Sequence, residues 1–352
     1  MRYLKYLMIY VLGLSLTQTA QAHINPENAG TASSSAESAS YREECSQATS
    51  QIDLDVNNVR ARLLVGGDIW WDGDDGLYIV PKPEEGSSTP PVSSLFAGAV
   101  WLGGFDTGGN LKIAAQTYGT NGGASDFWPG PLTEVGLVGK DTCADWDKFF
   151  TVSGGNIDQH IILWQAAVED GSLEIDVDEI PSDILGWPGY ANPFFFQIHD
   201  FELPLRAAQG YAPFFDENDN GVYEPHLGDY PVIEIRGCEE NQLSSGPQYG
   251  DEMIFWIYND AGNSHTQTGG DAIQMEVQVQ AFGYATNDEV NDMTFYRYKL
   301  INWAIDAIDS TFFAMWVDPD LGCYLDDYVG CDTSLGMMYV YNSDALDGNA
   351  SC

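Results

Sequence analysis

The stretch MEVQVQAFGY (Met275–Tyr284) decides the fold class of this chain. Apolar Met, Val, Val and Ala alternate with Glu and Gln, which is the period of a β-strand with one apolar and one polar face. Three neighbouring segments share its enrichment in β-branched and aromatic residues: MIFWIYND (253–260), MTFYRYKLINWA (293–304) and STFFAMWVD (310–318). We therefore expect a block of long strands over residues 251–342.

A second β-rich block is predicted upstream, over residues 55–139. Strand-length runs such as SLFAGAVWLGGFD (94–106) are separated there by Gly, Asp and Asn, and the turn FDTGGNL (105–111) predicts a hairpin. Between the two blocks, helix-start signals near Asp141 and Asn156 predict a small helical insert over residues 140–190. The expected fold is mainly β: β-sandwich-like antiparallel sheets with a helical insert and a calcium-binding loop, in one unit over residues 55–342.

The first 22 residues have the features of a secretory signal peptide. A positively charged start precedes an apolar run over residues 7–16, and Ala20-Gln21-Ala22 gives a small-x-small cleavage pattern. The apolar run is shorter than the ~20 residues that cross a bilayer, and no later segment qualifies. We expect residues 23–54 to be a flexible lead-in and residues 343–352 a truncated tail. The sequence thus predicts an exported protein, extracellular or at the outer cell surface, with no transmembrane segment.

The charge balance narrows the class of partners. The chain has 13 Lys and Arg against 53 Asp and Glu, for a formal net charge of −40. Such a surface repels nucleic acid and anionic lipid, so neither is an expected partner, whereas divalent cations are attracted to it. Aromatic residues make up 13% of the chain and hydrophobic residues 44%, which predicts a globular protein with a large core and not a disordered one.

The segment DENDNGVYEPHLGDYP (216–231) has the spacing of the first half of a calcium loop. Oxygen-bearing side chains stand at positions 1, 3 and 5, and a glycine follows for the sharp turn. Position 12 is Leu227, so the bidentate glutamate of an EF-hand is missing and Asp229 is its nearest replacement. The predicted ligands of a structural calcium ion are Asp216, Asn218, Asn220, the backbone carbonyl of Val222, Glu224 and Asp229. The alternative is an Asx-rich turn without a metal.

A second acidic segment, MWVDPDLGCYLDDYVGCD (315–332), predicts a further calcium site. Several carboxylates this close in sequence repel one another unless a cation or solvent relieves the repulsion. The candidate ligands are Asp318, Asp320, Asp326 and Asp327; the alternative is a solvated acidic loop. The same segment holds Cys323 and Cys331, which are the disulfide candidate suggested by proximity, since export permits disulfides.

No motif selects a catalytic residue or an organic cofactor site. Glycosidase chemistry needs two carboxylates at a defined separation, but 53 acidic residues offer too many pairs to choose from. The sequence has no G-x-S-x-G elbow and no phosphate-binding glycine loop. Trp128 in DFWPGPL (126–132) is the best candidate for an exposed ring that stacks on a ligand, although aromatic residues dominate β-sandwich interiors. His265, in a polar glycine-rich loop, is expected to hydrogen-bond within that loop.

Several segments together resemble large secreted proteins of Bacteroidota, which usually carry a C-terminal type IX secretion sorting domain. The resemblance covers about residues 55–342. It implies passage through the outer membrane by the type IX secretion machinery and display at, or release from, the cell surface; it brings no catalytic residues. The segments that carry it are SLFAGAVWLGGFDTGGNLKIAAQTYG, DFWPGPL, DENDNGVYEPHLGDYP, the run from Met253 to Asn302, and MWVDPDLGCYLDDYVGCD.

Two functions from different classes follow from the sequence. The first is a secreted or cell-surface, calcium-stabilised β-rich module that contacts an extracellular glycan, matrix or surface protein without catalysis. The alternative is a secreted polysaccharide-acting enzyme, similar to glycoside hydrolases, that uses paired carboxylates. An ion cage lined by carboxylates favours the module, and a cleft with two close carboxylates and exposed tryptophan favours the enzyme.

Overall fold

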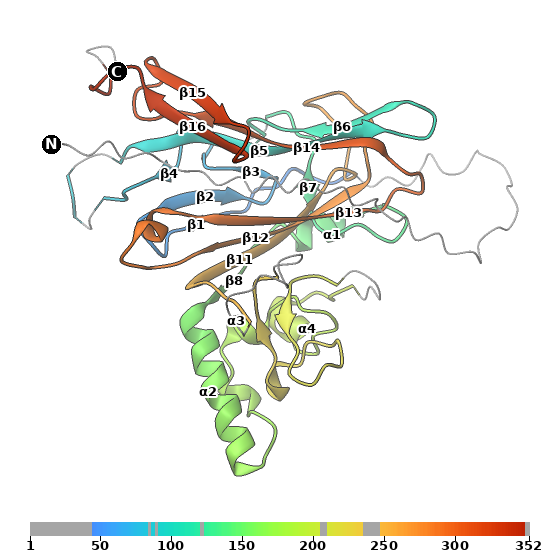
Figure 1. Cartoon of the computed structure of the whole chain (residues 1–352). Helices are drawn as coiled ribbons and strands as arrows, with labels where there is room; N and C mark the ends of the chain where they lie inside the picture. Colours follow the sequence, from blue (N-terminus) through green and yellow to red (C-terminus); the bar gives the residue numbers. More distant parts are fainter. Residues whose placement is uncertain are drawn as a thin grey trace, which may run out of the picture.

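The computed structural model describes residues 44–83, 86–88, 91–119, 123–204, 210–234 and 247–348. The fold is mainly β and antiparallel, as predicted. Two large sheets face each other, and a helical layer covers the free face of one of them (Figure 1). The predicted signal peptide, most of the predicted lead-in and the last residues of the predicted tail lie outside the described residues.

The first sheet has seven strands. β14 comes from the downstream block yet pairs with β5 over most of its length, so the two predicted blocks share one sheet. The order is β1-β2-β3-β5-β14. In addition, β4 pairs with both β2 and β5, and β6 pairs with β5. The strands are β1 (Gln51–Leu54), β2 (Arg60–Leu64), β3 (Asp68–Ile69), β4 (Tyr78–Ile79), β5 (Ser93–Phe105), β6 (Leu111–Ala115) and β14 (Asp309–Pro319). The predicted hairpin at residues 105–111 is the β5–β6 turn, where Asp106 N donates to Asn110 O at 3.0 Å.

The second sheet has five strands in the order β13-β12-β11-β7, with β8 also paired to β11. The alternating stretch 275–284 forms its strand β12. The strands are β7 (Trp128–Pro129), β8 (Phe150–Ser153), β11 (Glu252–Asn259), β12 (Met275–Gly283) and β13 (Phe295–Asn302). Two smaller ladders complete the described β structure: β9 (Phe214–Phe215) with β10 (Tyr230–Pro231), and β15 (Asp327–Asp332) with β16 (Met337–Asn342).

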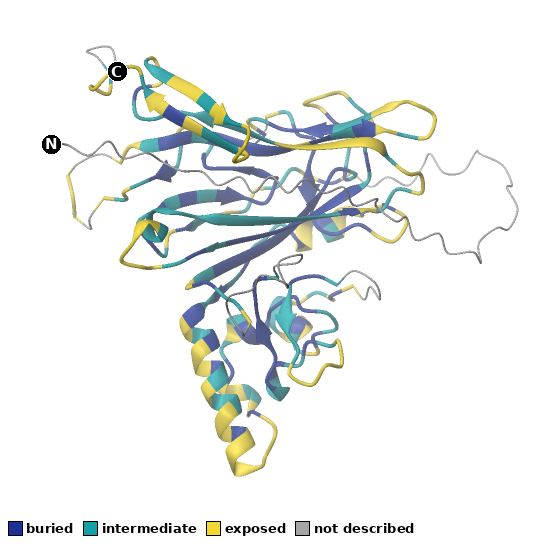
Figure 2. Cartoon of the chain, in the orientation of Figure 1, coloured by how far each residue is buried: buried dark blue, intermediate teal, exposed yellow. Residues whose placement is uncertain are grey.

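The main core lies between the two large sheets. Leu63, Val100 and Leu102 of the seven-stranded sheet are buried in one apolar cluster with Trp256 and Val277 of the five-stranded sheet. This face-to-face packing of two antiparallel sheets is the arrangement of a β-sandwich. Figure 2 shows the burial concentrated along the facing strands.

The helical insert packs on the outer face of the five-stranded sheet. Residues of its helices and loops form a second apolar cluster with β11, in which Trp187, Phe195 and Tyr223 meet Met253 and Phe255; the layer therefore extends beyond its predicted end at residue 190. The helices are α1 (Lys140–Asp145), α2 (Gly154–Asp170), α3 (Ser182–Leu185) and α4 (Phe195–His199), with single turns η2 (Val177–Glu179), η3 (Pro225–Leu227) and η5 (Glu289–Asp292). Within the described ranges, no helix is long and apolar enough to cross a membrane.

The starts of the two predicted helices differ from expectation. Ser153, not Asn156, caps α2, because its Oγ accepts the Asn156 backbone N–H at 3.1 Å. Helix α1 begins before Asp141 and ends at Asp145, and residues 150–153 form strand β8 because they pair with β11.

The polar face predicted for β12 is not solvated. Glu276, Gln278 and Gln280 are buried because the helical layer covers this face of the sheet. Their polar groups are partly satisfied inside the protein: Glu276 Oε2 accepts the Leu132 N–H at 2.8 Å, and Gln280 Nε2 donates to Val232 O at 2.9 Å. Period-two alternation therefore identified the strand and its polar face, and that face lies under the helical layer.

The described end of the predicted lead-in belongs to the folded unit. Strand β1 begins at Gln51, and Cys45 forms a disulfide with Cys143 of α1. Thr49 N and Ser50 N donate to the Asp147 carboxylate. The boundary predicted at residue 54 was wrong, because a stretch of small polar residues lacks the hydrophobic period yet is held here by the disulfide and by backbone hydrogen bonds.

Candidate metal centres

The predicted calcium loop lies between β9 and β10, two short strands that pair antiparallel. The chain turns sharply there, with Asp219 at φ +57° and Gly221 at φ +78°, a region that favours glycine. Asp216 Oδ2 accepts the Gly221 N–H at 2.6 Å, and Asp216 Oδ1 accepts the Asn220 N–H at 3.2 Å. The loop is thus folded around the carboxylate at position 1.

Asp229 draws the two halves of this loop together. It is fully buried, and its carboxylate accepts the backbone N–H of Glu217 at 2.9 Å and of Glu224 at 2.7 Å. Burial raises the pKa of Asp229 to about 6, and the nearby carboxylates of Asp216 and Glu224 add to the rise. Three predicted ligands are therefore close enough in space to repel one another.

The remaining loop side chains also hydrogen-bond within the loop. Asn218 Oδ1 accepts the Asn220 N–H at 3.1 Å, Asn220 Oδ1 accepts the Val222 N–H at 2.7 Å, and Asn220 Nδ2 donates to Glu224 at 2.5 Å. These Asx turns are what the metal-free alternative requires. They are compatible with an ion as well, because each oxygen keeps a second lone pair.

Across the described residues, no three His, Cys, Asp or Glu side chains are grouped so that they could hold a metal ion. Calcium also takes amide and backbone carbonyl oxygens, and three of the six ligands predicted in the 216–231 loop are of those kinds. The individual oxygen atoms of each candidate site therefore decide whether it suits a calcium ion.

The second candidate site lies at the foot of the β15–β16 hairpin, and its three aspartates do not form such a metal-holding group either. One side-chain oxygen on each of four residues is buried and has no hydrogen-bond partner: Asp320, Asp326, Asp327 and Asn342. Asp327 and Asn342 are directly opposite each other in the β15–β16 ladder, which places their Cβ atoms about 5 Å apart on one face. Buried oxygens without a donor are costly, and a cation would satisfy them.

The other oxygens of this site hold the surrounding backbone. Asp327 Oδ2 accepts the Leu321 N–H at 2.7 Å, and Asp347 Oδ1 accepts the Cys323 N–H at 2.9 Å. Gly322 has φ +82°, and a Cβ on it would lie 2.1 Å from Asp347 Oδ2. Only glycine therefore lets Asp347 approach the turn this closely.

The electrostatics of this site show that the carboxylates interact. Burial, together with the nearby carboxylates of Asp327, Asp318 and Asp347, raises the pKa of Asp320 to about 6. The pKa of Asp327 is raised by burial and by Asp326 and Asp347. A divalent cation would reverse these effects, because it favours the ionised form of each group.

The contacts of Asp318 differ from those of the other predicted ligands. Asp318 Oδ2 accepts the Tyr118 hydroxyl at 2.5 Å and lies at the edge of the group. Two further members were missed in the sequence, Asn342 and Asp347. Asn342 lies on the strand opposite Asp327, and pairing of the two strands would have been needed to find it. Asp347 lies beyond the hairpin, outside the acidic segment 315–332.

The predicted disulfide between Cys323 and Cys331 was wrong. Cys331 is a free, exposed cysteine, and Cys323 is bonded to a different cysteine. The reason is the strand: residues 327–332 are extended in β15. A strand rises about 3.3 Å per residue, which carries Cys331 beyond the ~7 Å separation of Cα atoms that a disulfide spans.

Trp128, predicted to be exposed, is buried at 3% exposure. It packs beside the Cys45–Cys143 disulfide, and its ring centroid is 5.9 Å from that of His265. The two short ladder pairings of β7 with β11 place this tryptophan inside the fold. The proline and glycine next to Trp128 therefore accompany a short strand that pairs with β11, and they do not indicate an exposed ring.

His265 hydrogen-bonds to Asp260 of its own loop, as expected, but also to Ile113 of β6 outside that loop, and these partners show its charge. Nδ1 lies 2.7 Å from Ile113 O and Nε2 lies 2.7 Å from Asp260 O. Carbonyl oxygens only accept, so both ring nitrogens must donate and the imidazole is protonated. The carboxylates of Asp126 and Asp260 lie 3.7 and 3.8 Å from the ring nitrogens and balance this buried charge. These contacts indicate a structural ion cluster.

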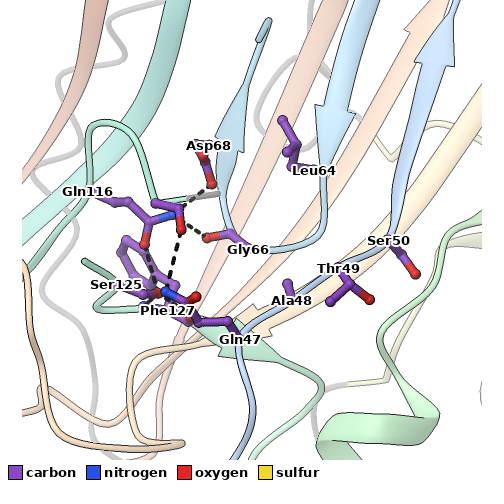
Figure 3. A pocket seen from close by; sticks show the side chains of 11 residues that line it. Gln47, Ala48, Thr49, Ser50, Leu64, Gly66, Asp68, Gln116, Ser125 and Phe127 are labelled. Atoms are coloured by element: carbon purple, nitrogen blue, oxygen red, sulfur yellow. Dashed lines mark hydrogen bonds between the residues drawn. The ribbon is translucent and has the colours of Figure 1, made fainter. Parts of the chain in front are cut away.

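A small cavity of about 10 Å³ lies between the segment before β1, the strands β2 and β3, and the segment before β7, enough for about one water molecule. Figure 3 shows Gln116 crossing its wall, with Nε2 donating to Asp68 Oδ1 at 2.6 Å and to Gly66 O at 3.1 Å. Ser125 Oγ donates to Gln116 Oε1 at 3.0 Å. The cavity is too small for a substrate, and its polar groups form a buried network.

No protein-family model, curated protein or solved structure matches this chain. The function proposed below is therefore argued from the chain's own geometry and chemistry.

Proposed function

We propose that this chain is a secreted or cell-surface, calcium-stabilised β-rich module that serves adhesion, matrix or glycan contact without catalysis. The observation that carries the proposal is the set of four buried, unpartnered oxygens at the foot of the β15–β16 hairpin. Calcium is a hard cation that takes six to eight oxygen ligands from carboxylates, amides and backbone carbonyls, and the site supplies the first two kinds.

We propose two calcium ions, each held by its own set of residues. Asp320, Asp326, Asp327 and Asn342 would hold one ion, with Asp347 and Asp318 at its border. Asp216, Asn218, Asn220, Val222 O, Glu224 and Asp229 would hold the other. Bound calcium would neutralise repelling carboxylates and cross-link segments that are distant in sequence, which stabilises the folded state by mass action.

Export is supported by the disulfide chemistry and the charge. Cys45 and Cys143 are buried and bonded to each other, and such bonds persist in oxidising compartments. A net charge of −40 suits a setting rich in salt and divalent cations. The proposed route is the type IX secretion machinery, on the strength of the resemblance to secreted Bacteroidota proteins.

Calcium titration calorimetry on the chelator-treated chain tests the proposal. We expect two sites with dissociation constants of about 10⁻⁴–10⁻³ M, the range of extracellular modules. Asp320→Ala should remove one site and Asp216→Ala the other. Asp309→Ala, which changes an exposed acid on the same strand as Asp318 but away from the hairpin foot, is the matched control and should keep both. Wild-type protein that binds no calcium would refute the calcium assignment.

One observation favours the alternative of a polysaccharide-acting enzyme. Asp320 has its pKa raised to about 6 beside other carboxylates, which is the condition of a general acid. If the chain is an enzyme, it should release reducing sugar from a neutral polysaccharide, and Asp320→Asn should lose this activity. If it is a binding module, it should release no sugar from any polysaccharide that it binds.

A further inference from the structure

The outer face of the seven-stranded sheet carries aromatic side chains outside the main core, and Trp316 among them packs on a small buried cluster of Leu64, Trp71 and Ala97. Val100 and Leu102 of β5 point into the core, so Trp101 points outward, since side chains alternate along a strand. The register pairs Trp101 with Ala314 and Ala99 with Trp316. The rings of Trp101 and Trp316 are therefore neighbours across the β5–β14 ladder; their planes are 5° from parallel and their centroids 6.1 Å apart.

Tyr118 extends this group. Its ring stands at 89° to that of Trp316, at 5.3 Å, and at 69° to that of Trp71, also at 5.3 Å. Trp101 and Tyr118 are 38% and 39% exposed, whereas Trp71 is buried beneath them. We call Trp101, Tyr118 and Trp316 the aromatic platform.

The polar end of each of these rings except Trp316 is tied to a fixed partner. Trp101 Nε1 donates to Gln116 O at 2.7 Å, and Tyr118 donates to Asp318. Below them, Trp71 Nε1 donates to Asp68 Oδ2 at 2.7 Å, and Asp68 also accepts from Gln116 (Figure 3). Hydrogen bonds of this kind hold ring orientation before a ligand arrives, which lowers the entropic cost of binding.

The apolar surface continues beyond the platform along the same face. Gly103 pairs with Phe312, which is 71% exposed, and Phe105 pairs with the exposed Leu111. The alanines and the glycine between the rings have little or no side chain, so nothing rises above the sheet between one ring and the next. The exposed rings therefore follow one another along β5 and β14 in a row, which matches an extended ligand better than a compact one.

We propose that the aromatic platform binds a neutral polysaccharide chain. The apolar faces of pyranose rings would stack on the exposed aromatic rings, as amphipathic surfaces do. The Asp318 carboxylate, at the border of the platform, keeps an acceptor for sugar hydroxyls. A chain with net charge −40 disfavours sulfated or uronate-rich glycans, so the occupant is neutral.

This inference deepens the glycan-contact part of the proposed function and rests on it, but it does not rest on calcium. Asp318 is the one residue that belongs to both places, since it accepts from Tyr118 and contributes to the raised pKa of Asp320. Glycan binding and calcium binding are thus measured separately, and either can fail alone.

Affinity electrophoresis through gels that contain hydroxyethyl cellulose, xyloglucan or laminarin tests the platform, in calcium and in chelator. We expect the wild-type chain to be retarded by at least one of these neutral polymers and not by pectin or heparin. Trp101→Ala and Trp316→Ala should each weaken binding about ten-fold, a typical loss for a central aromatic contact. Tryptophan fluorescence should shift on binding in the wild type and less in Trp101→Ala.

The control is Phe196→Ala, which removes a 52% exposed ring on α4, in the helical insert; it should bind like the wild type. Circular dichroism checks that each variant is folded, and Trp101→Phe replaces Trp101→Ala if the latter is not. Three results would overturn the proposal: no retardation by any of the neutral polymers, equal binding by the folded platform variants, or a stable dimer in solution that Trp101→Ala separates.

Discussion

At the scale of single residues, His265 is the sharpest example of a side chain whose surroundings define its state. Both ring nitrogens face carbonyl oxygens, and two buried aspartates flank the ring. Removing the imidazolium would leave Asp126 and Asp260 without their counter-charge in the interior, which is the costly way to break a buried ion pair.

His265→Ala should therefore lower the free energy of unfolding by about 3–5 kcal/mol, measured by urea denaturation. The neighbouring Gln267→Ala changes an exposed side chain and should cost less than about 0.5 kcal/mol. A cost for His265→Ala as small as that of the control would show that the ring is not the charged partner of the two aspartates.

Asp320 gives a prediction for pH. Its folded pKa of about 6 lies above the ordinary value of 3.8, so the folded state holds a proton that the unfolded state has released. Without calcium, the stability contributed by Asp320 therefore falls as pH rises from about 4 to about 6. Calcium needs the ionised carboxylate, so its affinity should rise over the same window.

Calorimetry in the Asp216→Ala background isolates the second site. We expect calcium binding there to be roughly ten-fold weaker at pH 5 than at pH 7, since most of an acid with a pKa of about 6 is protonated at pH 5. Asp320→Asn should bind weakly at both pH values. An affinity independent of pH in the Asp216→Ala protein would contradict the assignment of Asp320 as a ligand.

At the scale of elements, the 216–231 loop depends on Asp229 for its closure. The carboxylate binds the backbone N–H groups of Glu217 and Glu224, and these charge-assisted bonds exist whether or not an ion is bound. Asp229→Ala should cost about 2–3 kcal/mol of stability in chelator as well as in calcium. Asp216→Ala should cost more in calcium than in chelator. Thermal unfolding of both variants in both buffers separates closure of the loop from ion binding, and a calcium-independent effect of Asp216→Ala would argue for the Asx turn alone.

The β15–β16 hairpin is the element that calcium should order most. A two-stranded ladder is marginal on its own, and Tyr328, Val329 and Tyr341 are exposed on it. The four unpartnered oxygens lie at its foot. Amide hydrogen exchange in β15 and β16 should therefore speed up several-fold in chelator, while β11 and β12, buried on both faces, stay protected. Equal protection of the hairpin with and without calcium would show that calcium does not stabilise it.

The elements also show what sequence patterns can predict. Long strands were readable because β-branched and aromatic residues at period two leave few alternatives over β11, β12 and β13. The environment of the polar face was not readable: the alternation shows that Gln278 and Gln280 share a polar face, but not that this face is buried under the helical layer. Burial of a second face depends on where the insert packs, and local sequence does not encode that.

The candidate sites divide in the same way. The loop at residues 216–231 is local, and Asp216 and Glu224 lie close enough to Asp229 to raise its pKa; their role as calcium ligands stays a prediction. The hairpin site depends on strand pairing, which added Asn342, and on a glycine turn, which admitted Asp347. Cys331 and Trp128 were misjudged because one depends on the extent of a strand and the other on a two-residue bridge to β11.

At the scale of the whole molecule, a large surplus of acid is placed on a two-sheet sandwich whose core is apolar. Self-repulsion of 53 acidic residues opposes the compact state, and monovalent salt screens it only in part. Calcium would act at two defined places, at the 216–231 loop below the five-stranded sheet and at the hairpin beside the seven-stranded sheet (Figure 1). The central claim is that these ions hold the module in its folded form.

Thermal unfolding of the chain in calcium and in chelator, at equal ionic strength, tests that claim most directly. With about 10 mM calcium and dissociation constants near 10⁻⁴ M, each site should add about 2.7 kcal/mol, and the melting temperature should rise by about 5 °C or more. Magnesium at the same concentration is the matched control and should give a smaller rise. Asp216→Ala and Asp320→Ala should each lose part of the calcium effect, and the double variant nearly all of it. A melting temperature that is the same in calcium and in chelator would contradict the account.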